Sequence, residues 1–269
     1  MRQIQFVKMV ASGNDFVVVE VPQFPSTPAL KALAKKICQR KYGVGADGLL
    51  VLEKSRIADV RMRVFNPDGS EAQMCGNGAR CVALYRSHVA PGGSHVKIET
   101  KAGIIYAEVI NDNVKIKLTD PTGLRLDIPI LINNRKLQVN YINTGVPHTV
   151  IFVESLDKIN VVGIGRLIRY HNKFIPKGTN VDFIEVLSRD SIKIRTYERG
   201  VEDETLACGT GVVASALIFS LKTKTGNEVK VLTKSREVLT VYFRKAGNRF
   251  SDVWLQGMAR IVHKGEYYV

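Results

Sequence analysis

The sequence predicts an α+β protein built from two pseudo-symmetric, duplicated domains, each a mostly antiparallel β-sheet wrapped around a central α-helix. Two observations lead to this prediction. Short sequence matches recur at a near-constant separation along the 269-residue chain. In addition, alternating or wholly apolar β-branched runs indicate strands, while one segment in each half is apolar on nearly all sides. The second pattern is typical of a helix enclosed by other elements.

The duplication rests on four matches that occur in the same order in both halves. Cys75 and Cys208, each followed by a short glycine turn, are separated by 208 − 75 = 133 residues. Three further pairs of segments lie 132 or 133 residues apart: residues 8–20 with 141–154, 45–53 with 178–186, and 62–69 with 194–201. Such repetition at one separation indicates a duplicated module.

The expected elements follow the same order in each half. Strands are predicted over 16–21, 61–66 and within 95–120 in the first half, and over 148–153, 192–198 and within 228–257 in the second. A surface helix over 26–41 is indicated by Ser26 or Thr27 as a cap before Pro28, and its counterpart over 160–174 contains glycines. The enclosed helices follow the cysteine turns, over 76–89 and 209–224.

The division between the halves is expected near residues 119–124, where Pro and Gly interrupt the strand pattern. This gives an N-terminal domain of residues 1–120 with 262–269 and a C-terminal domain of residues 121–261. The N-terminal domain is discontinuous because the last segment can return to it as a strand. Each domain holds one of the paired cysteines.

Composition narrows the function classes. Apolar residues make up 45% and charged residues 24% of the chain, as in globular proteins. No signal peptide or apolar run long enough to span a membrane is recognised, so a cytoplasmic, soluble protein is expected. The net charge of +14 raises the possibility of a nucleic-acid partner. The basic residues are dispersed and match no nucleic-acid-binding signature, so the sequence does not favour that partner, and the charge can instead attract an anionic substrate.

The cysteine turns predict a site for thiol chemistry. Without a secretory signal the four cysteines are expected to be free thiols, and no pair has the spacing of a zinc site. A thiol at a helix start experiences the positive end of the helix dipole, which lowers a cysteine pKa to about 3.5–7.5. Backbone N–H groups of the glycine turn can also bind an anion such as a carboxylate.

Two such turns facing each other across a cleft between the domains suit one reaction class. Inversion of a stereocentre without a cofactor needs one base that removes a proton from one face and one acid that delivers a proton to the other. A thiolate and a thiol can exchange these roles, and the helix N-termini stabilise charge that develops on the substrate carboxylate. Neither a metal nor another cofactor is required.

At the level of motifs, the chain closely resembles the diaminopimelate epimerase family. The resemblance lies in "KMVASGNDFVVVE", "FNPDGSEAQMCGNGARC", "GTNVDF" and "YERGVEDETLACGTG" and covers essentially the whole chain. It implies a pyridoxal-independent isomerase that interconverts LL- and meso-diaminopimelate in bacterial lysine and peptidoglycan synthesis. It also implies a homodimer and an active site in the inter-domain cleft.

The resemblance assigns roles to particular residues. Cys75 and Cys208 match the two catalytic thiols, and His148 and Glu198 are expected to assist catalysis. The expected substrate-binding residues are Asn14, Asn66, Gly76, Asn77, Asn180, Glu198, Arg199, Gly209 and Thr210. The substrate's distal end is itself an amino acid, so a guanidinium suits its carboxylate and oxygen acceptors suit its ammonium.

Two departures from the family pattern stand out. The second half reads Gly145-Val146-Pro147-His148, whereas the family usually has Asn in place of Val146, so one amide contact is lost. The stretch that leads to Cys208 is one residue longer than the usual form, which can reshape the preceding loop.

Some assignments have a structural alternative. His148 can be a hydrogen-bonded loop residue, and the three asparagines can be turn residues. Cys38 and Cys81 are expected to be buried, inert thiols. Other cofactor-independent isomerases of the same fold, such as proline racemases and phenazine-pathway proteins, remain the second functional hypothesis. A basic nucleic-acid-binding protein is the third.

Overall fold

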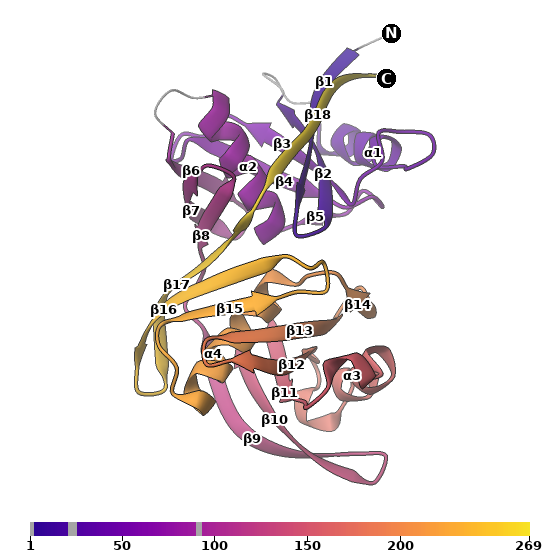
Figure 1. Ribbon diagram of the computed structural model, residues 1–269. Coiled ribbons are helices and arrows are strands. Elements are labelled where there is room, and N and C mark those ends of the chain that lie inside the picture. The colour runs from indigo at the N-terminus through magenta and orange to yellow at the C-terminus, as the bar shows by residue number, and fades with distance from the viewer. Residues whose placement is uncertain (1–2, 21–25, 90–92) are drawn as a thin grey trace. The chain divides into compact units, whose positions relative to one another are not determined.

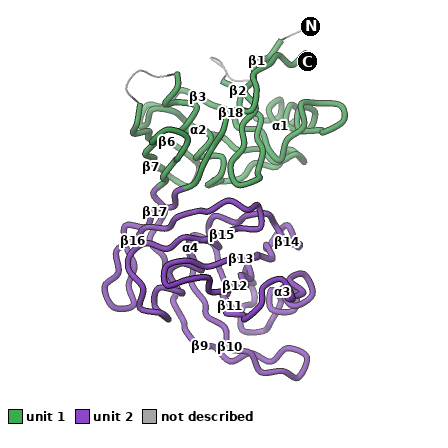
Figure 2. Tube along the Cα trace, viewed as in Figure 1, with its two compact units in different colours: residues 1–116, 257–269 green, residues 117–256 purple. Residues whose placement is uncertain are grey.

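The computed structural model describes residues 3–20, 26–89 and 93–269, and the chain forms two compact units. Unit 1 comprises residues 1–116 with 257–269, and unit 2 comprises residues 117–256, as Figure 2 shows. The divisions therefore fall after Ile116 and Gln256, a few residues before the positions expected from the sequence pattern. No helix in the described ranges is long and apolar enough to cross a membrane.

Unit 1 combines short strands with two helices (Figure 1). Its elements in chain order are β1 (Gln3–Ala11), β2 (Asn14–Glu20), α1 (Thr27–Ile37), β3 (Gly48–Glu53), β4 (Val60–Phe65), β5 (Glu71–Ala72), α2 (Gly76–Val89), β6 (His95–Thr100), β7 (Gly103–Ile110), β8 (Asn113–Lys117) and β18 (Arg260–Tyr268). Strand β18 pairs antiparallel with β1, which brings the last segment of the chain into the first unit.

From β10 onward, unit 2 repeats the order that unit 1 follows from β1 to β8. Its elements are β9 (Thr122–Ile132), β10 (Arg135–Asn143), β11 (Pro147–Phe152), α3 (Val161–Arg169), β12 (Asn180–Ser188), β13 (Ser191–Glu198), β14 (Asp203–Thr205), α4 (Gly209–Thr223), β15 (Glu228–Leu232), β16 (Val238–Ala246) and β17 (Arg249–Met258), with short 3₁₀ turns at Leu156–Lys158 and Asn172–Phe174. The helix expected over 160–174 is therefore shorter, because α3 ends at Arg169 and only a 3₁₀ turn follows. Strand β9 pairs with β10 as β18 pairs with β1.

Most strand pairs in both units are antiparallel, which confirms the predicted α+β class. The parallel exceptions occur at equivalent places: β2 with β3 and β4 with β6 in unit 1, and β11 with β12 and β13 with β15 in unit 2. Each parallel pair is bridged by a connection that contains a helix, as parallel strands require.

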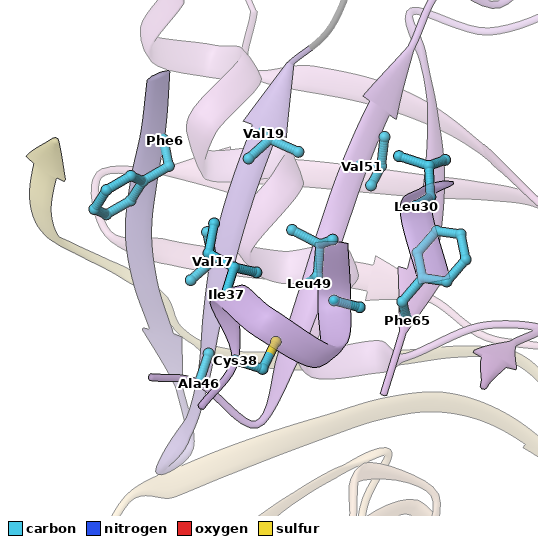
Figure 3. Close-up of a cluster of buried hydrophobic side chains, with 11 residues drawn as sticks. Phe6, Val17, Val19, Leu30, Ile37, Cys38, Ala46, Leu49, Val51 and Phe65 are labelled. Atoms are coloured by element: carbon cyan, nitrogen blue, oxygen red, sulfur yellow. The ribbon is translucent and has the colours of Figure 1, made fainter. Parts of the chain in front are cut away.

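Each sheet is covered by helices, and Figure 3 shows the core between the sheet of unit 1 and α1. Leu30 and Ile37 of α1 pack with Leu49 and Val51 of β3. Cys38 joins this cluster, and burial raises its pKa to about 11, consistent with an inert thiol. The equivalent cluster of unit 2 lies between α3 and β12.

The enclosed helices α2 and α4 are the central helices of the two units. Every residue of α4 from Gly211 to Ser220 is buried, and α2 is buried from Gly78 to Leu84. Cys81 lies within the buried part of α2 and is fully covered. A helix apolar on all sides needs such surroundings, as the sequence predicted.

The strand registers correct one detail of the duplication. The parallel ladders begin at Phe16 opposite Gly48 in unit 1 and at His148 opposite Asn180 in unit 2, and 148 − 16 and 180 − 48 are both 132. Strand β12 is therefore displaced from β3 by 132 residues, and not by the 133 that the sequence match suggested. The separation becomes 133 at β5 and β14, because the additional residue lies in the turn before β14.

Candidate active site

Both paired cysteines lie immediately before the first turn of a central helix. The carbonyl of Cys75 accepts a hydrogen bond from Ala79 N (2.8 Å), and the carbonyl of Cys208 accepts one from Val212 N (2.9 Å). Each cysteine therefore occupies the N-cap position, where free backbone N–H groups gather. In unit 1 the N–H of Gly78 points at Cys75 Sγ, 3.4 Å away.

A chain of polar side chains surrounds Cys75. The Sγ of Cys75 lies 4.0 Å from Oδ1 of Asn14, which also accepts a hydrogen bond from Nδ2 of Asn77 (3.4 Å). The fully buried Arg80 donates to Oδ1 of Asn77 (2.6 Å) and to Ser12 (2.9 Å). The structure thus brings Asn14, Asn77 and Cys75 together, and adds Arg80, whose importance was not recognised from the sequence.

Asn66 behaves differently from the other predicted site residues of unit 1. Its side chain is exposed and donates to the hydroxyl of Ser70 (2.9 Å), and its backbone N–H donates to the Ser70 carbonyl. These contacts close the turn between β4 and β5. Asn66 was expected either to bind substrate or to form a turn. Its described contacts are those of a turn residue.

Unit 2 places a hydrogen-bonded chain at the start of α4. Nδ1 of His148 lies 2.7 Å from Oδ2 of Asp182, and Nε2 of His148 lies 2.9 Å from Oγ1 of Thr210. The same Thr210 hydroxyl is 3.4 Å from Cys208 Sγ. His148 and Asp182 are fully buried. In the parallel pairing of β11 with β12, Asp182 lies opposite Val150, so His148 and Asp182 are diagonal neighbours on one face of the sheet.

Asp182 was not identified as a site residue from the sequence. Its position in β12 corresponds to Leu50 in β3, since 182 − 50 is 132. A Cβ on Gly78 would lie 3.0 Å from a methyl group of Leu50, and a Cβ on Gly211 would lie 2.4 Å from Oδ1 of Asp182. The carboxylate thus occupies a place that a leucine fills in unit 1. An acidic residue between the apolar residues Val181 and Phe183 of "NVDFIEV" is the signal that could have revealed it.

Burial favours the protonated thiol form of Cys208 over the thiolate. The side chain is covered, and burial, followed by the nearby carboxylates of Glu198 and Asp182, raises the pKa of Cys208 well above its usual value. The expectation that a helix start lowers this pKa is therefore wrong for Cys208, because removal from water disfavours the thiolate more than the helix terminus favours it. Burial also raises the pKa of the Glu198 carboxyl.

Three further predicted residues of unit 2, Asn180, Glu198 and Arg199, lie at the start of β12 and around the end of β13. Oδ1 of Asn180 accepts a hydrogen bond from the backbone N–H of Arg199 (2.7 Å), and its Nδ2 donates to the Pro147 carbonyl (3.1 Å). The guanidinium of Arg199 donates to the Lys177 carbonyl (3.0 Å). Asn180 therefore connects the His148 strand to the Glu198–Arg199 segment.

An ion-pair clamp supports each cysteine loop. Arg63 pairs with Glu71 (2.7 Å), which also pairs with Lys101 (2.7 Å). The equivalent residues in unit 2 are Arg195, Glu204 and Lys234, with distances of 2.7 and 3.0 Å. In both units the clamp joins the strand before the loop to the short strand that leads to the cysteine. Across the described parts of the chain, no cluster of three or more potential metal ligands occurs.

Comparisons with known proteins agree with this arrangement. A family model described as diaminopimelate epimerase matches residues 6–123 and 140–255. The diaminopimelate epimerase of Aquifex aeolicus is 42% identical over 97% of each chain, and that of Methanocella arvoryzae is 41% identical over 99% of this chain and 97% of its own.

Solved structures show the same fold at much lower identity. A phenazine biosynthesis protein of the PhzF family from Bacillus anthracis has a TM-score of 0.77 and 20% identity, with both chains fully covered. A hydroxyproline epimerase from Agrobacterium vitis has a TM-score of 0.70 and 17% identity, over 99% of this chain and 91% of its own. These likenesses establish the fold, whereas the family model and the more similar relatives establish that the chain belongs to the diaminopimelate epimerase family.

Proposed function

We propose that the chain interconverts LL- and meso-2,6-diaminopimelate by removing the α-proton on one face and returning a proton on the other. One observation supports this most strongly: each of the two equivalent units carries a cysteine at the N-cap of its central helix. The family membership, at about 40% identity over nearly the whole chain, supplies the substrate. The chain is accordingly an isomerase.

Cys75 and Cys208 are the two proton-transferring groups in this proposal. For one isomer the first thiolate accepts the α-proton and the other thiol donates, and the roles reverse for the other isomer. Each sulfur therefore needs both protonation states during the catalytic cycle. We assign assisting roles to His148 and Glu198, which lie near Cys208 through Thr210 and through space, respectively.

The helix starts bind the reacting carboxylate. Backbone N–H groups of Gly76 and Asn77 in unit 1, and of Gly209 and Thr210 in unit 2, belong to the first turns of α2 and α4. N–H groups at these positions have no partner within the helix and carry its positive end. They stabilise the negative charge that grows on the carboxylate as the proton leaves.

The distal end of the substrate needs a cation and several oxygen acceptors. We assign its carboxylate to the guanidinium of Arg199, and its ammonium to oxygens drawn from Glu198, Asn14, Asn66 and Asn180. The contact between Asn180 and the backbone of Arg199 supports this, because it fixes the segment that carries both charged groups. Val146, half-buried in the turn before His148, supplies no amide to this set.

We further propose that units 1 and 2 are the two epimerase domains and that each supplies one of the two cysteines. A homodimer located in the cytoplasm follows from the family resemblance alone.

Proton NMR of the reduced protein with LL-diaminopimelate in heavy water tests the proposal. We expect the α-proton signal to disappear as the meso isomer forms. Proline and hydroxyproline serve as control substrates, because proteins of the same fold act on such amino acids. Exchange with proline and none with diaminopimelate would contradict the substrate assignment and leave the thiol chemistry standing.

A further inference from the structure

The buried pair of His148 and Asp182 fixes the direction of the hydrogen bonds near Cys208. A carboxylate can only accept, and the two oxygens of Asp182 accept from Nδ1 of His148 (2.7 Å) and from the hydroxyl of Thr196 (2.7 Å). Both members of the pair are withdrawn from water, so these donors replace the lost solvation of the charge. The proton of a neutral His148 therefore sits on Nδ1.

The opposite nitrogen of the ring is then an acceptor. Nε2 of His148 takes the hydroxyl proton of Thr210 (2.9 Å), which leaves the lone pairs of Oγ1 facing Cys208 Sγ (3.4 Å). A thiol at that distance donates its proton to the hydroxyl oxygen. The bonds thus run in one direction from Cys208 through Thr210 and His148 to Asp182.

We propose that Asp182 is a positioning residue that holds His148 as the proton acceptor of Cys208, with Thr210 as the carrier between them. The inference rests on the proposed function, in which Cys208 must lose and regain a proton in each catalytic cycle. In the transfer, the S–H bond breaks as its proton binds Oγ1 of Thr210. The original O–H bond of Thr210 breaks as an N–H bond forms at Nε2. The products are a thiolate and an imidazolium beside the Asp182 carboxylate, and the reverse steps restore the thiol.

The surroundings of Cys208 explain why such an acceptor is needed. Glu198 on β13 and Asp182 on β12 both place negative charge near the sulfur, and burial adds to their effect in raising the pKa of this thiol. A protonated His148 on β11 supplies the positive charge that stabilises the thiolate. Asp182 lies in direct contact with the ring that would carry this charge, with 2.7 Å between Oδ2 and Nδ1.

Unit 1 lacks this arrangement. The residues that correspond to His148 and Asp182 are Phe16 and Leu50, by the separation of 132 that the ladders define. Thr210 corresponds to Asn77, which is bonded to a buried cation, Arg80, and, within the described residues, to no histidine. The proposed relay is therefore a property of one half only.

The start of α4 packs directly against this pair at Gly211. A side chain on Gly211 would collide with Oδ1 of Asp182 at 2.4 Å and approach Cε1 of His148 at 3.2 Å. Only glycine lets the first helical turn lie so close above the pair.

The substitution Asp182→Asn tests the relay, because two accounts predict opposite signs. The ionisation of Cys208 is followed by the ultraviolet absorbance of the thiolate against pH in a Cys75→Ala protein, with Cys75→Ala/Cys208→Ala subtracted. We expect Asp182→Asn to move the midpoint upward by about one pH unit or more, since a neutral amide cannot balance the positive charge that His148 takes up in the proposed transfer. If Asp182 acted only as a nearby negative charge, its removal would move the midpoint downward. A downward or absent shift overturns the proposal.

Thr210 offers a matched control. Thr210→Ser keeps the hydroxyl and should preserve the upward shift caused by Asp182→Asn, whereas Thr210→Val should abolish it. An upward shift of the same size in the valine background would overturn the role of Thr210 as carrier.

A second measurement serves if Asp182→Asn does not fold. In the Cys75→Ala protein, nitrogen NMR shows which ring nitrogen of a neutral His148 carries the proton, and we expect Nδ1, with Nε2 left as the acceptor. A proton on Nε2 would overturn the proposal. Neither measurement contains substrate, so failure to turn over diaminopimelate would refute the proposed function without affecting this test.

Discussion

The two units of the chain share the framework of the site and differ in what lies beneath the cysteine helix. Both have the same order of strands, the same pattern of parallel pairs and a cysteine at the helix N-cap. Both also retain the Arg–Glu–Lys clamp behind the cysteine loop. The two units therefore share the structural features that hold each cysteine at the start of its central helix.

The difference lies on the sheet face that supports the helix. Unit 1 presents Leu50 under Gly78, whereas unit 2 presents Asp182 under Gly211, with His148 beside it. The polar chain around Cys75 includes a buried cation, Arg80, whereas the chain around Cys208 includes a buried anion, Asp182. A duplicated site can therefore keep its geometry while each thiol acquires its own proton chemistry.

Removal of either thiol should have the largest effect. We expect Cys75→Ala and Cys208→Ala each to lower the rate of epimerisation by about 10²–10⁴-fold or more, because each eliminates one proton-transferring group. The rate of meso-diaminopimelate formation measures this. Cys38→Ala, in the packed core, is the control that should leave the rate close to that of the wild type. Near-normal turnover by either site variant would refute a reaction that uses both thiols.

A matched pair of glycine substitutions sharpens the comparison of the helix supports. Gly211→Ala should destabilise the protein by about 2–3 kcal/mol, since its Cβ meets a buried carboxylate oxygen that cannot retreat. Gly78→Ala should cost less than about 1 kcal/mol, because its nearest neighbour is the end of a leucine side chain and alanine favours a helix. Urea unfolding of both variants measures the difference. Equal losses would show that the two supports are packed alike.

The clamps predict a smaller, pH-dependent effect. Arg63 is the main cause that holds the pKa of Glu71 at about 2, against the opposing effect of burial. A carboxyl with a lowered pKa in the folded state stabilises the fold above its unfolded pKa of about 4.3 and loses that contribution as the pH falls toward 2. Glu71→Gln should therefore cost about 1–2 kcal/mol at neutral pH and almost nothing near pH 2.

Glu204→Gln is the corresponding test in unit 2. Burial acts to raise the pKa of Glu204, but Arg195 and Lys234 outweigh it and leave the pKa lowered. The sign of the pH dependence is thus the same in both halves. Unfolding free energies of the two variants, measured between pH 2 and 7, check this. A cost that stays constant over this range in either variant would contradict the clamp in that unit.

Much of this structure could be predicted from the sequence, because duplication and hydrophobic periodicity are local signals. The repeated Cys-Gly turns located both N-caps, and the apolar segments after them identified α2 and α4. Asn14 and Asn77, expected from the sequence as substrate-binding residues, lie beside Cys75, and their binding role stays a prediction. These residues lie in motifs long enough to align with each other or with the family.

What could not be predicted depends on contacts between distant strands. Asp182 becomes a partner of His148 only through the parallel register of β11 with β12, which a one-residue error in the internal alignment conceals. The raised pKa of Cys208 likewise follows from burial and from carboxylates on two other strands. A helix start alone indicates the opposite sign, because the dipole is visible in the sequence and the desolvation is not.

The central claim is that two separate groups, one in each unit, handle the proton. Its most direct test is the early time course of LL-diaminopimelate in heavy water, in which deuterium is located by NMR in both the remaining substrate and the newly formed meso isomer. Two bases predict deuterium at the inverted carbon of the meso product while the remaining LL isomer still keeps its α-proton. Meso product that retains the original proton, or LL isomer that exchanges as fast as product appears, would contradict the claim.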